Sequence, residues 1–141
     1  MNKLKKFLKL PLSMKLMIPE ALLLTAWYRY RILKRPFREL AEEIGVSNFE
    51  TPHDHADSPI PLQISIVIGI VGKRTPWESK CLVRALTAMR MLHRRDFSST
   101  LYMGVKLENG EMKAHAWLRC GDLYVTGGTG AGYAVTGIFG K

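Results

Sequence analysis

Two residues of this chain have the types and positions that chemistry on a carbonyl group requires. Cys81 opens the apolar helical pattern of residues 81–86, and His115 lies further along, in the strand-like run of residues 114–118. The start of a helix stabilises a thiolate, and an imidazole can accept the thiol proton. The pair therefore predicts a cysteine nucleophile with a histidine as its base.

The element that positions Cys81 is predicted to be an amphipathic helix ending near Arg95. Its start has two interpretations: residues 75–78 (Thr-Pro-Trp-Glu) resemble a capping box, or Ser79 is the cap and Cys81 the second helical residue. The second suits catalysis better, because backbone N–H groups at that position are unpaired. In both interpretations one face of the helix collects Leu82, Ala85, Leu86, Met89 and Leu92 or His93.

The element that positions His115 is predicted to be the second strand of a hairpin. Asn109-Gly110 is a strong type I′ turn signal, and pairing about this turn puts Gly104 directly across from His115. A second two-residue turn at Gly121-Asp122 puts Gly128 across from His115 on its other side. Glycine on both sides leaves room for a substrate to approach the ring. The alternative is a structural histidine that is buried and satisfied.

The other cysteine is not predicted to be a nucleophile. Cys120 is separated from His115 by an odd number of positions on the same strand, so the two side chains point to opposite faces. The same parity disfavours a zinc site built from Cys81, His115 and Cys120. For Cys81 itself the alternative is a small buried apolar residue, as is common for free cysteines.

A helical N-terminal layer is predicted to precede these elements. Residues 13–34 form a helix that Pro36 ends, and residues 37–44 form a second helix closed by Gly45. The first has Leu16, Leu23, Trp27 and Tyr30 on a broad apolar face, and the second has Phe37, Leu40, Ala41 and Ile44 at helical spacing.

The middle of the chain is predicted to be a loop followed by a helix. Residues 47–61 collect prolines and the polar run 53–57. His53 and His55 could bind a metal only with further ligands at a usual spacing, which the sequence lacks, so a solvated loop is favoured. Residues 62–71 fit a strand by their β-branched residues and a buried helix by their length, and we favour the helix.

Length and composition predict one globular domain over residues 1–141, with residues 1–50 as a basic helical layer and residues 75–141 as the catalytic helix plus sheet. The chain is 47% hydrophobic and 23% charged, close to globular averages. Two cysteines are too few for a disulfide framework, and neither a secretory signal nor a membrane span is visible. These features predict a cytoplasmic protein.

The net charge of +9 lies in the N-terminal region, where residues 1–38 hold ten Lys or Arg and one Glu. Such a region attracts an acidic protein or peptide, anionic lipid or nucleic acid, or it only solvates the chain. Nucleic acid is disfavoured as a partner, because the basic residues lie on an apolar helix and no nucleic-acid motif is present.

Taken together, the motifs resemble those of a known family. Thr75-Pro76-Trp77, Cys81-Leu82-x-Arg84-Ala85-Leu86 and His115-Ala116-Trp117-Leu118 are similar to motifs of the leader peptidases of lasso peptide biosynthesis, within the transglutaminase-like, papain-like cysteine protease superfamily. The resemblance covers most of the chain and is densest over residues 75–128. It implies an α+β fold, with the nucleophile-bearing helix packed on an antiparallel sheet, and a cysteine protease with no cofactor or metal.

The resemblance also implies a substrate and partners. Members cut the bond between the leader and the core of a ribosomally made precursor, and a separate lasso cyclase then closes the ring. Some members carry a leader-recognition domain, for which 141 residues leave no room, so a separate recognition protein is expected. The basic N-terminal helices, with Arg29, Arg31, Lys34 and Arg35, would bind that protein or an acidic leader.

The sequence departs from the family pattern at the residue that should orient the imidazole. The family's Asp position falls at Gly127, and Asp122 lies about 17–20 Å along the strand from His115, which is too far. The orienting group is expected to be a backbone carbonyl, Thr126, Thr129, Asp54 or Asp57. The backbone N–H of Cys81 is one expected oxyanion donor, and Gln63, Trp77 and Ser79 are candidates for the second.

Two other functions share these residues. The missing Asp favours a noncatalytic module that binds a peptide or partner on the same fold. An acyltransferase using the same Cys81–His115 pair would transfer the acyl group to an amine instead of water.

Overall fold

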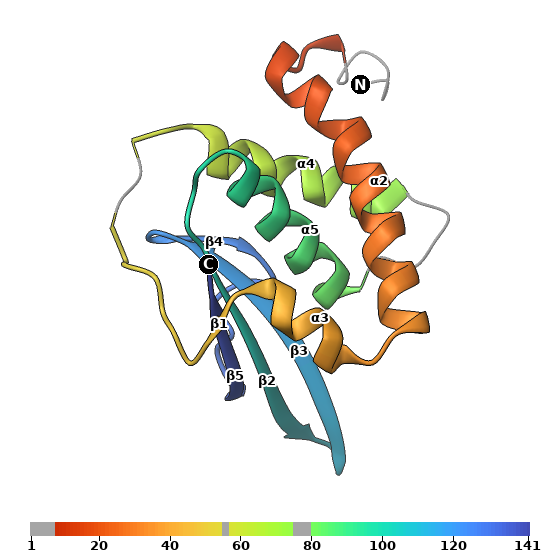
Figure 1. The fold of residues 1–141 in the computed structure, drawn as a ribbon, viewed down its shortest axis with the longest axis vertical. Helices are drawn as coiled ribbons and strands as arrows, with labels where there is room; N and C mark the ends of the chain where they lie inside the picture. The colour runs from red at the N-terminus through yellow and green to blue at the C-terminus, as the bar shows by residue number, and fades with distance from the viewer. Residues whose placement is uncertain (1–7, 55–56, 75–79) are drawn as a thin grey trace.

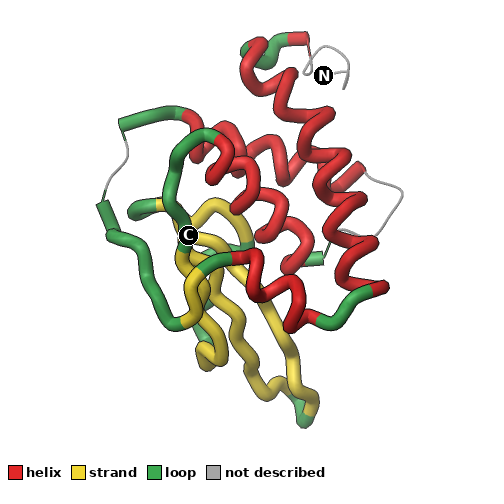
Figure 2. Tube along the Cα trace, viewed as in Figure 1, coloured by secondary structure: helices red, strands yellow, loops and turns green. Residues whose placement is uncertain are grey.

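Helices pack on one face of a five-stranded antiparallel sheet in the computed structural model, which describes residues 8–54, 57–74 and 80–141 (Figure 1). The helices are α2 (Leu12–Lys34), α3 (Phe37–Ile44), α4 (Ile60–Arg74) and α5 (Cys81–Arg94). Figure 2 shows the helical layer in red and the sheet in yellow. The predicted α+β class, with the Cys81 helix packed on an antiparallel sheet, is confirmed.

The sheet has the strand order β1-β5-β2-β3-β4. Its strands are β1 (Val46–Ser47), β2 (Thr100–Glu108), β3 (Glu111–Cys120), β4 (Leu123–Thr126) and β5 (Ala134–Gly140). The β2–β3 hairpin turns at Asn109 and Gly110, which both have positive φ, and it places Gly104 opposite His115 as predicted. The C-terminal strand β5 pairs with the other edge of β2, a strand that the sequence had not predicted.

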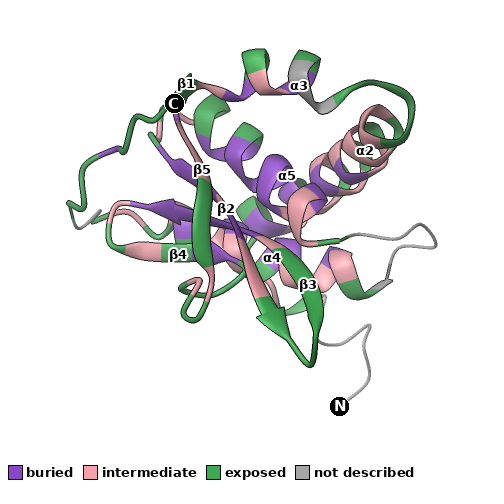
Figure 3. Ribbon diagram, turned by 90° about the horizontal axis from the view of Figure 1, so that it is seen from below, coloured by how far each residue is buried: buried purple, intermediate pink, exposed green. Residues whose placement is uncertain are grey.

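Helix α5 lies at the centre of the core, and Figure 3 shows it buried along most of its length. The predicted face is buried at Ala85, Leu86, Met89 and Leu92, whereas His93 is exposed. The sheet meets this face with Leu101, Ala116, Leu118 and Cys120, and α4 adds Ile64, Val67, Ile68 and Val71. The apolar face of α5 and the inward-pointing side chains of the strands therefore pack together in one apolar layer.

The predicted helices are confirmed, and the segment 62–71 is part of the helix α4. The predicted loop 47–61 is shorter than expected, because Ser47 ends β1 and Ile60 begins α4. His55 and the proposed caps at positions 75–79 lie outside the described residues.

Helix α2 turns its predicted apolar face to solvent. Leu16, Leu23, Trp27 and Tyr30 are exposed, while Met14, Met17, Ala21 and Thr25 are buried. Apolar residues occur on nearly all sides of this helix, so its periodicity does not determine which side packs on α4 and α5.

Strands β3 and β4, joined by the predicted turn at Gly121-Asp122, pair in the predicted register only next to that turn. Cys120 pairs with Leu123 and Arg119 with Tyr124, but a bulge then shifts the register so that Leu118 pairs with Thr126, where β4 ends. The prediction that Gly128 pairs with His115 is therefore wrong.

A buried arginine joins the sheet to the segment before α4. Arg119 is fully buried and donates to the carbonyl oxygens of Thr51, Pro52 and Gly121 and to the Tyr102 hydroxyl. The backbone N–H of Thr51 in turn donates to Thr100 Oγ1. A guanidinium has five donors in a planar fork, which suits it to hold several carbonyls at once.

Candidate active site

Cys81 and His115 both line one pocket of about 450 Å³, which lies between α2, the start of α5 and the β2–β3 pair. Helix α2 contributes Arg29, Ile32 and Leu33, and the start of α5 contributes residues 80–83. The sheet contributes Met103 and residues 114–116. The volume is within the usual range for ligand pockets. Sequence reasoning missed the α2 wall, because the apolar pattern of α2 runs around the whole helix.

Cys81 is the first residue of α5 and is half-buried. The cap position belongs to Lys80, which has extended backbone and no side-chain cap bond, so the prediction that Cys81 is the second helical residue is wrong by one position. The first N–H groups of a helix have no partner within the helix. The thiol therefore lies beside backbone donors that can stabilise negative charge, the property that the sequence argument required.

Arg84 ties the first turn of α5 to the end of α4. Its Nη2 donates to the carbonyl oxygen of Gly72 at 3.3 Å, and a Cβ at position 72 would lie only 2.6 Å from Arg84 Nε. Glycine at position 72 thus allows the guanidinium to pass close to the α4 backbone. This contact helps to fix where α5 starts, and therefore where Cys81 lies.

The imidazole of His115 is held by a backbone carbonyl. Its Nε2 lies 2.7 Å from the carbonyl oxygen of Gly127. A carbonyl oxygen can only accept, so Nε2 carries the proton, and Nδ1 of the neutral ring has a free lone pair to act as a base. Of the orienting groups that we considered, the backbone carbonyl is the one bonded to the ring.

A carboxylate at position 127 does not fit this geometry. Gly127 has φ +76°, and a Cβ there would lie 2.5 Å from the Ala116 carbonyl oxygen and 2.8 Å from Trp117 Cβ. Thr126 does not replace it, because its buried Oγ1 has no hydrogen-bond partner among the residues that the structure describes. The loop therefore presents its main chain to His115 where the family pattern has an Asp.

The His115 ring packs among aromatic side chains on the face of the sheet that points away from α5. Its centroid lies 5.8 Å from that of Trp117 and 5.0 Å from that of Tyr133. Ala116 belongs to the core under the helices, and successive side chains of a strand point to opposite faces. The structure thus brings Cys81 and His115 to one pocket, with the thiol on the helix side of β3 and the ring on the aromatic side.

The space above Gly104 is not open as we had expected. A Cβ at position 104 would lie 2.9 Å from the Trp117 ring, so the indole fills the room that the missing side chain leaves. On the other side of β3, the ladder with β4 stops at Leu118, and the Gly127 loop rather than a paired strand lies beside His115.

Cys120 has the opposite environment to Cys81. It is buried in the core, and burial raises the pKa of its thiol, although the neighbouring Arg119 lowers it and Asp122 raises it further. A neutral buried thiol is a poor nucleophile, which agrees with the parity argument from the sequence. Among the described residues, no group of three His, Cys, Asp or Glu could hold a metal.

The candidates for a second oxyanion donor stay unassigned. Gln63 accepts a hydrogen bond from Ser13 Oγ at 3.2 Å and does not line the Cys81 pocket. Trp77 and Ser79 lie outside the described residues.

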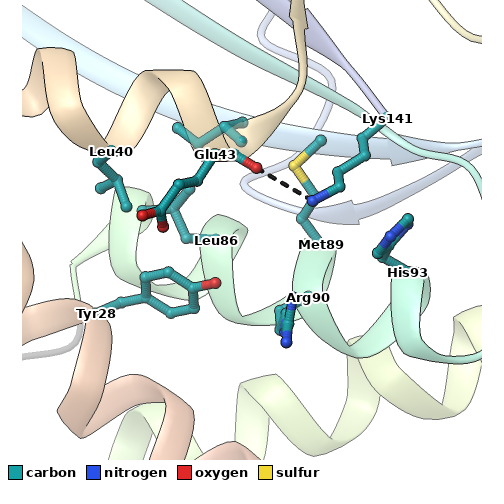
Figure 4. Close-up of a pocket in the computed structure, with 9 residues that line it drawn as sticks. Tyr28, Leu40, Glu43, Leu86, Met89, Arg90, His93 and Lys141 are labelled. Atoms are coloured by element: carbon teal, nitrogen blue, oxygen red, sulfur yellow. Dashed lines mark hydrogen bonds between the residues drawn. The ribbon is translucent and has the colours of Figure 1, made fainter.

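A second hollow, between α2, α3 and α5, is too small for a peptide. It has a volume of about 50 Å³, and Figure 4 shows Tyr28, Glu43 and Lys141 around it. Lys141 Nζ donates to the Glu43 carbonyl oxygen at 3.1 Å, and burial raises the pKa of Tyr28. This hollow lies where the C-terminus is fastened to α3.

No helix in the described part of the chain has the length and apolarity that a bilayer span requires.

Comparisons with known proteins place the chain in a family. A search of the curated proteins and a search of the solved structures each gave no match. The family model of the transglutaminase-like superfamily matches residues 21–138, which include α5, β3 and most of α2. Cysteine-based hydrolases and transferases are typical of that superfamily. The protein therefore belongs to the transglutaminase-like superfamily.

Proposed function

We propose that this protein is a cysteine peptidase that removes the leader from the precursor of a lasso peptide. The observation that carries the proposal is the pocket shared by Cys81, at the start of α5, and His115. The family match and the resemblance of the Cys81 and His115 motifs to lasso leader peptidases support it.

The proposed reaction is acyl transfer to water through a thioester. His115 takes the Cys81 proton, and the sulfur attacks the scissile carbonyl carbon. The carbon–nitrogen bond then breaks as His115 returns the proton to the leaving amine. Water, deprotonated by His115, attacks the thioester, which releases the acid and restores the thiol. The backbone N–H of Cys81 is the proposed donor to the oxyanion.

The carbonyl of Gly127 has a defined part in this proposal. Because it accepts from Nε2, it keeps the lone pair on Nδ1, the atom that must face the sulfur. The ring packs on the aromatic side of β3, so in this proposal Nδ1 approaches the sulfur past the edge of β3 beyond the end of its ladder with β4. Catalytic hydrogen bonds commonly tighten only once substrate is bound.

The proposal includes partners and a location. The precursor peptide is the substrate, a separate leader-recognition protein delivers it, and a lasso cyclase consumes the cleaved core. We place the reaction in the cytoplasm, where the two free thiols stay reduced.

Mass spectrometry of a candidate precursor tests the proposal. The precursor is mixed with the protein, with and without its recognition protein, and the masses of the products are measured. We expect leader and core from the wild type, and no cleavage by Cys81→Ala or His115→Ala. Cys120→Ala is the matched control, since its thiol is buried, and it should still cleave. Equal cleavage by Cys81→Ala and wild type would contradict the peptidase.

A noncatalytic binding module is the second candidate. The observation that favours it is the packing of the imidazole with Trp117 and Tyr133, on the face away from α5. If the protein only binds, the wild type and Cys81→Ala should bind the precursor equally well, and neither should cut it. An acyltransferase would instead give an amide of the core or leader when a primary amine is added.

A further inference from the structure

The outer face of α2 presents a long apolar stripe to solvent. Leu23 is 73% exposed, Trp27 51% and Leu33 65%. The stripe consists of Leu12, Leu16, Leu23, Trp27, Tyr30 and Leu33, and we call it the α2 stripe. At about 1.5 Å per residue it extends for roughly 30 Å. Contiguous exposed apolar surface of this kind marks an interaction site.

The α2 stripe leads directly to the Cys81 pocket. Its C-terminal end forms a shallow hollow of about 270 Å³ with Ala26, Arg29, Tyr30 and Leu33. Arg29 and Leu33 also line the 450 Å³ pocket that holds Cys81. A chain lying in the pocket can therefore continue onto the outer face of α2 without leaving the surface.

The charges around the α2 stripe are mostly positive. Lys15, Arg29, Arg31 and Lys34 belong to the helix, whose sequence contains one acid, Glu20, and of these four basic residues Arg31 is paired with Glu43 of α3. That carboxylate is already bound by Arg94 and Arg95 at 2.6 Å each. A ligand with apolar side chains and carboxylates would thus match both the surface and its charge.

We propose that the α2 stripe is the docking surface for an acidic, apolar segment of the peptide substrate, adjacent in sequence to the bond that is cut. The inference rests on the proposed peptidase function, because it identifies where the rest of that substrate lies. At about 3.3 Å per residue, an extended segment of roughly nine or ten residues covers the stripe. Its apolar side chains lie over Leu23, Trp27 and Leu33, and its carboxylates face the basic side chains.

The hollow at the end of the α2 stripe favours a peptide over a bilayer. The two hollows that share Arg29 and Leu33 can each take a side chain, whereas an interfacial helix needs only a convex apolar face. A second copy of this chain fits poorly, because two basic α2 faces would repel each other.

Fluorescence anisotropy on the Cys81→Ala protein tests docking separately from cleavage. The probe is a labelled synthetic peptide of about ten residues that alternates Leu or Phe with Asp or Glu. We expect Leu23→Ser with Trp27→Ser to weaken its binding about tenfold or more, since buried aromatic anchors dominate such interfaces. Lys34→Glu should weaken it further at low salt, an effect that high salt removes.

Matched controls lie on the β2–β3 hairpin, at residues that line neither of the two hollows. Leu107→Ser changes an equally exposed leucine, and Lys113→Glu an exposed lysine, and neither should alter binding. Circular dichroism confirms that each variant is folded. Equal losses in the stripe and hairpin variants would overturn the inference, as would binding of phosphatidylglycerol vesicles but not of the peptide.

Cleavage of a precursor by the otherwise wild-type protein separates this inference from the proposed function. A KM that is raised about tenfold in the Leu23→Ser and Trp27→Ser variants, with little change in kcat, supports docking. Normal KM in those variants overturns docking and leaves the peptidase standing. Absence of cleavage, with peptide binding that still depends on the stripe, overturns the peptidase and supports docking.

Discussion

At the scale of single residues, the fit of Gly127 against β3 decides how His115 is held. The carbonyl of Gly127 can approach the ring because this residue adopts φ +76° and carries no Cβ. Any larger residue would meet the Ala116 carbonyl oxygen at 2.5 Å. The loop thus provides a backbone acceptor where a side-chain carboxylate would not fit.

Gly127→Ala should therefore destabilise the protein more than Gly128→Ala. Both positions have positive φ, so both variants bear the left-handed strain of about 1 kcal/mol or more. A Cβ at position 128 meets no atom of the described part of the chain within 4 Å, so the extra loss at position 127 isolates the clash. Urea unfolding gives the two free energies, and the ¹⁵N shifts of His115 report whether Nε2 still carries the proton. Equal losses would show that the clash is relieved elsewhere.

The two thiols should differ sharply in reactivity towards iodoacetamide. Cys81 is half-buried beside the pocket, whereas Cys120 is buried in the core and its pKa is raised by that burial. We expect mass spectrometry to find Cys81 alkylated in the folded protein and Cys120 alkylated only in denaturant. Alkylation of both thiols at similar rates without denaturant would show that the core around Cys120 opens readily.

The sequence predicted Cys81 and His115 as the residues of interest, because each stands in a strong local pattern. The helical period places Cys81 at the start of α5, and Asn109-Gly110 fixes the partner of His115. The Gly127 contact was not predictable, because a bulge moves the register of β4 and a carbonyl partner leaves no signature in residue type.

At the scale of elements, Arg119 links pieces that are distant in sequence. It belongs to β3, yet it donates to carbonyls of Thr51 and Pro52, which precede α4, and of Gly121 in the next turn. Nothing in the local pattern marks this arginine, because its neighbours predict only a strand. Likewise β5 was not predicted, because its pairing with β2 is a long-range contact that depends on the folded sheet.

Arg119→Met should lower the free energy of unfolding by about 3 kcal/mol or more, because the buried carbonyl of Thr51 and the partly buried carbonyls of Pro52 and Gly121 lose their donor. Arg119→Lys should recover only part of this loss, since an ammonium lacks the planar fork. Arg94→Ala is the control: Arg94 is exposed and Glu20 keeps its second partner Arg95, so its removal should cost less than about 1 kcal/mol. Denaturant unfolding of the three variants measures these differences. A loss for Arg119→Met as small as the control would mean that the segment before α4 is held by other contacts.

At the scale of the whole molecule, thiol and phenol groups with raised pKa values contribute to how stability changes at high pH. Burial raises the pKa of Cys120, Tyr28 and Tyr102, and Arg119 partly offsets the rise at Tyr102. Above the ordinary pKa values of these groups, the unfolded chain releases protons that the folded protein retains. The unfolded state then binds fewer protons, so stability falls as the pH rises.

Cys120→Ala should make this alkaline loss of stability shallower. The thiol's contribution is fully present below about pH 9, its ordinary pKa, and is lost as the pH rises through the raised value in the fold. At neutral pH the variant should be about 1 kcal/mol less stable, because a small cavity replaces the sulfur. Above about pH 9 the stability curves of the variant and the wild type should converge, because only the wild type loses the contribution of the thiol. Urea unfolding at a series of pH values measures both curves. Parallel curves for the variant and the wild type would show that the Cys120 proton does not contribute to the decline.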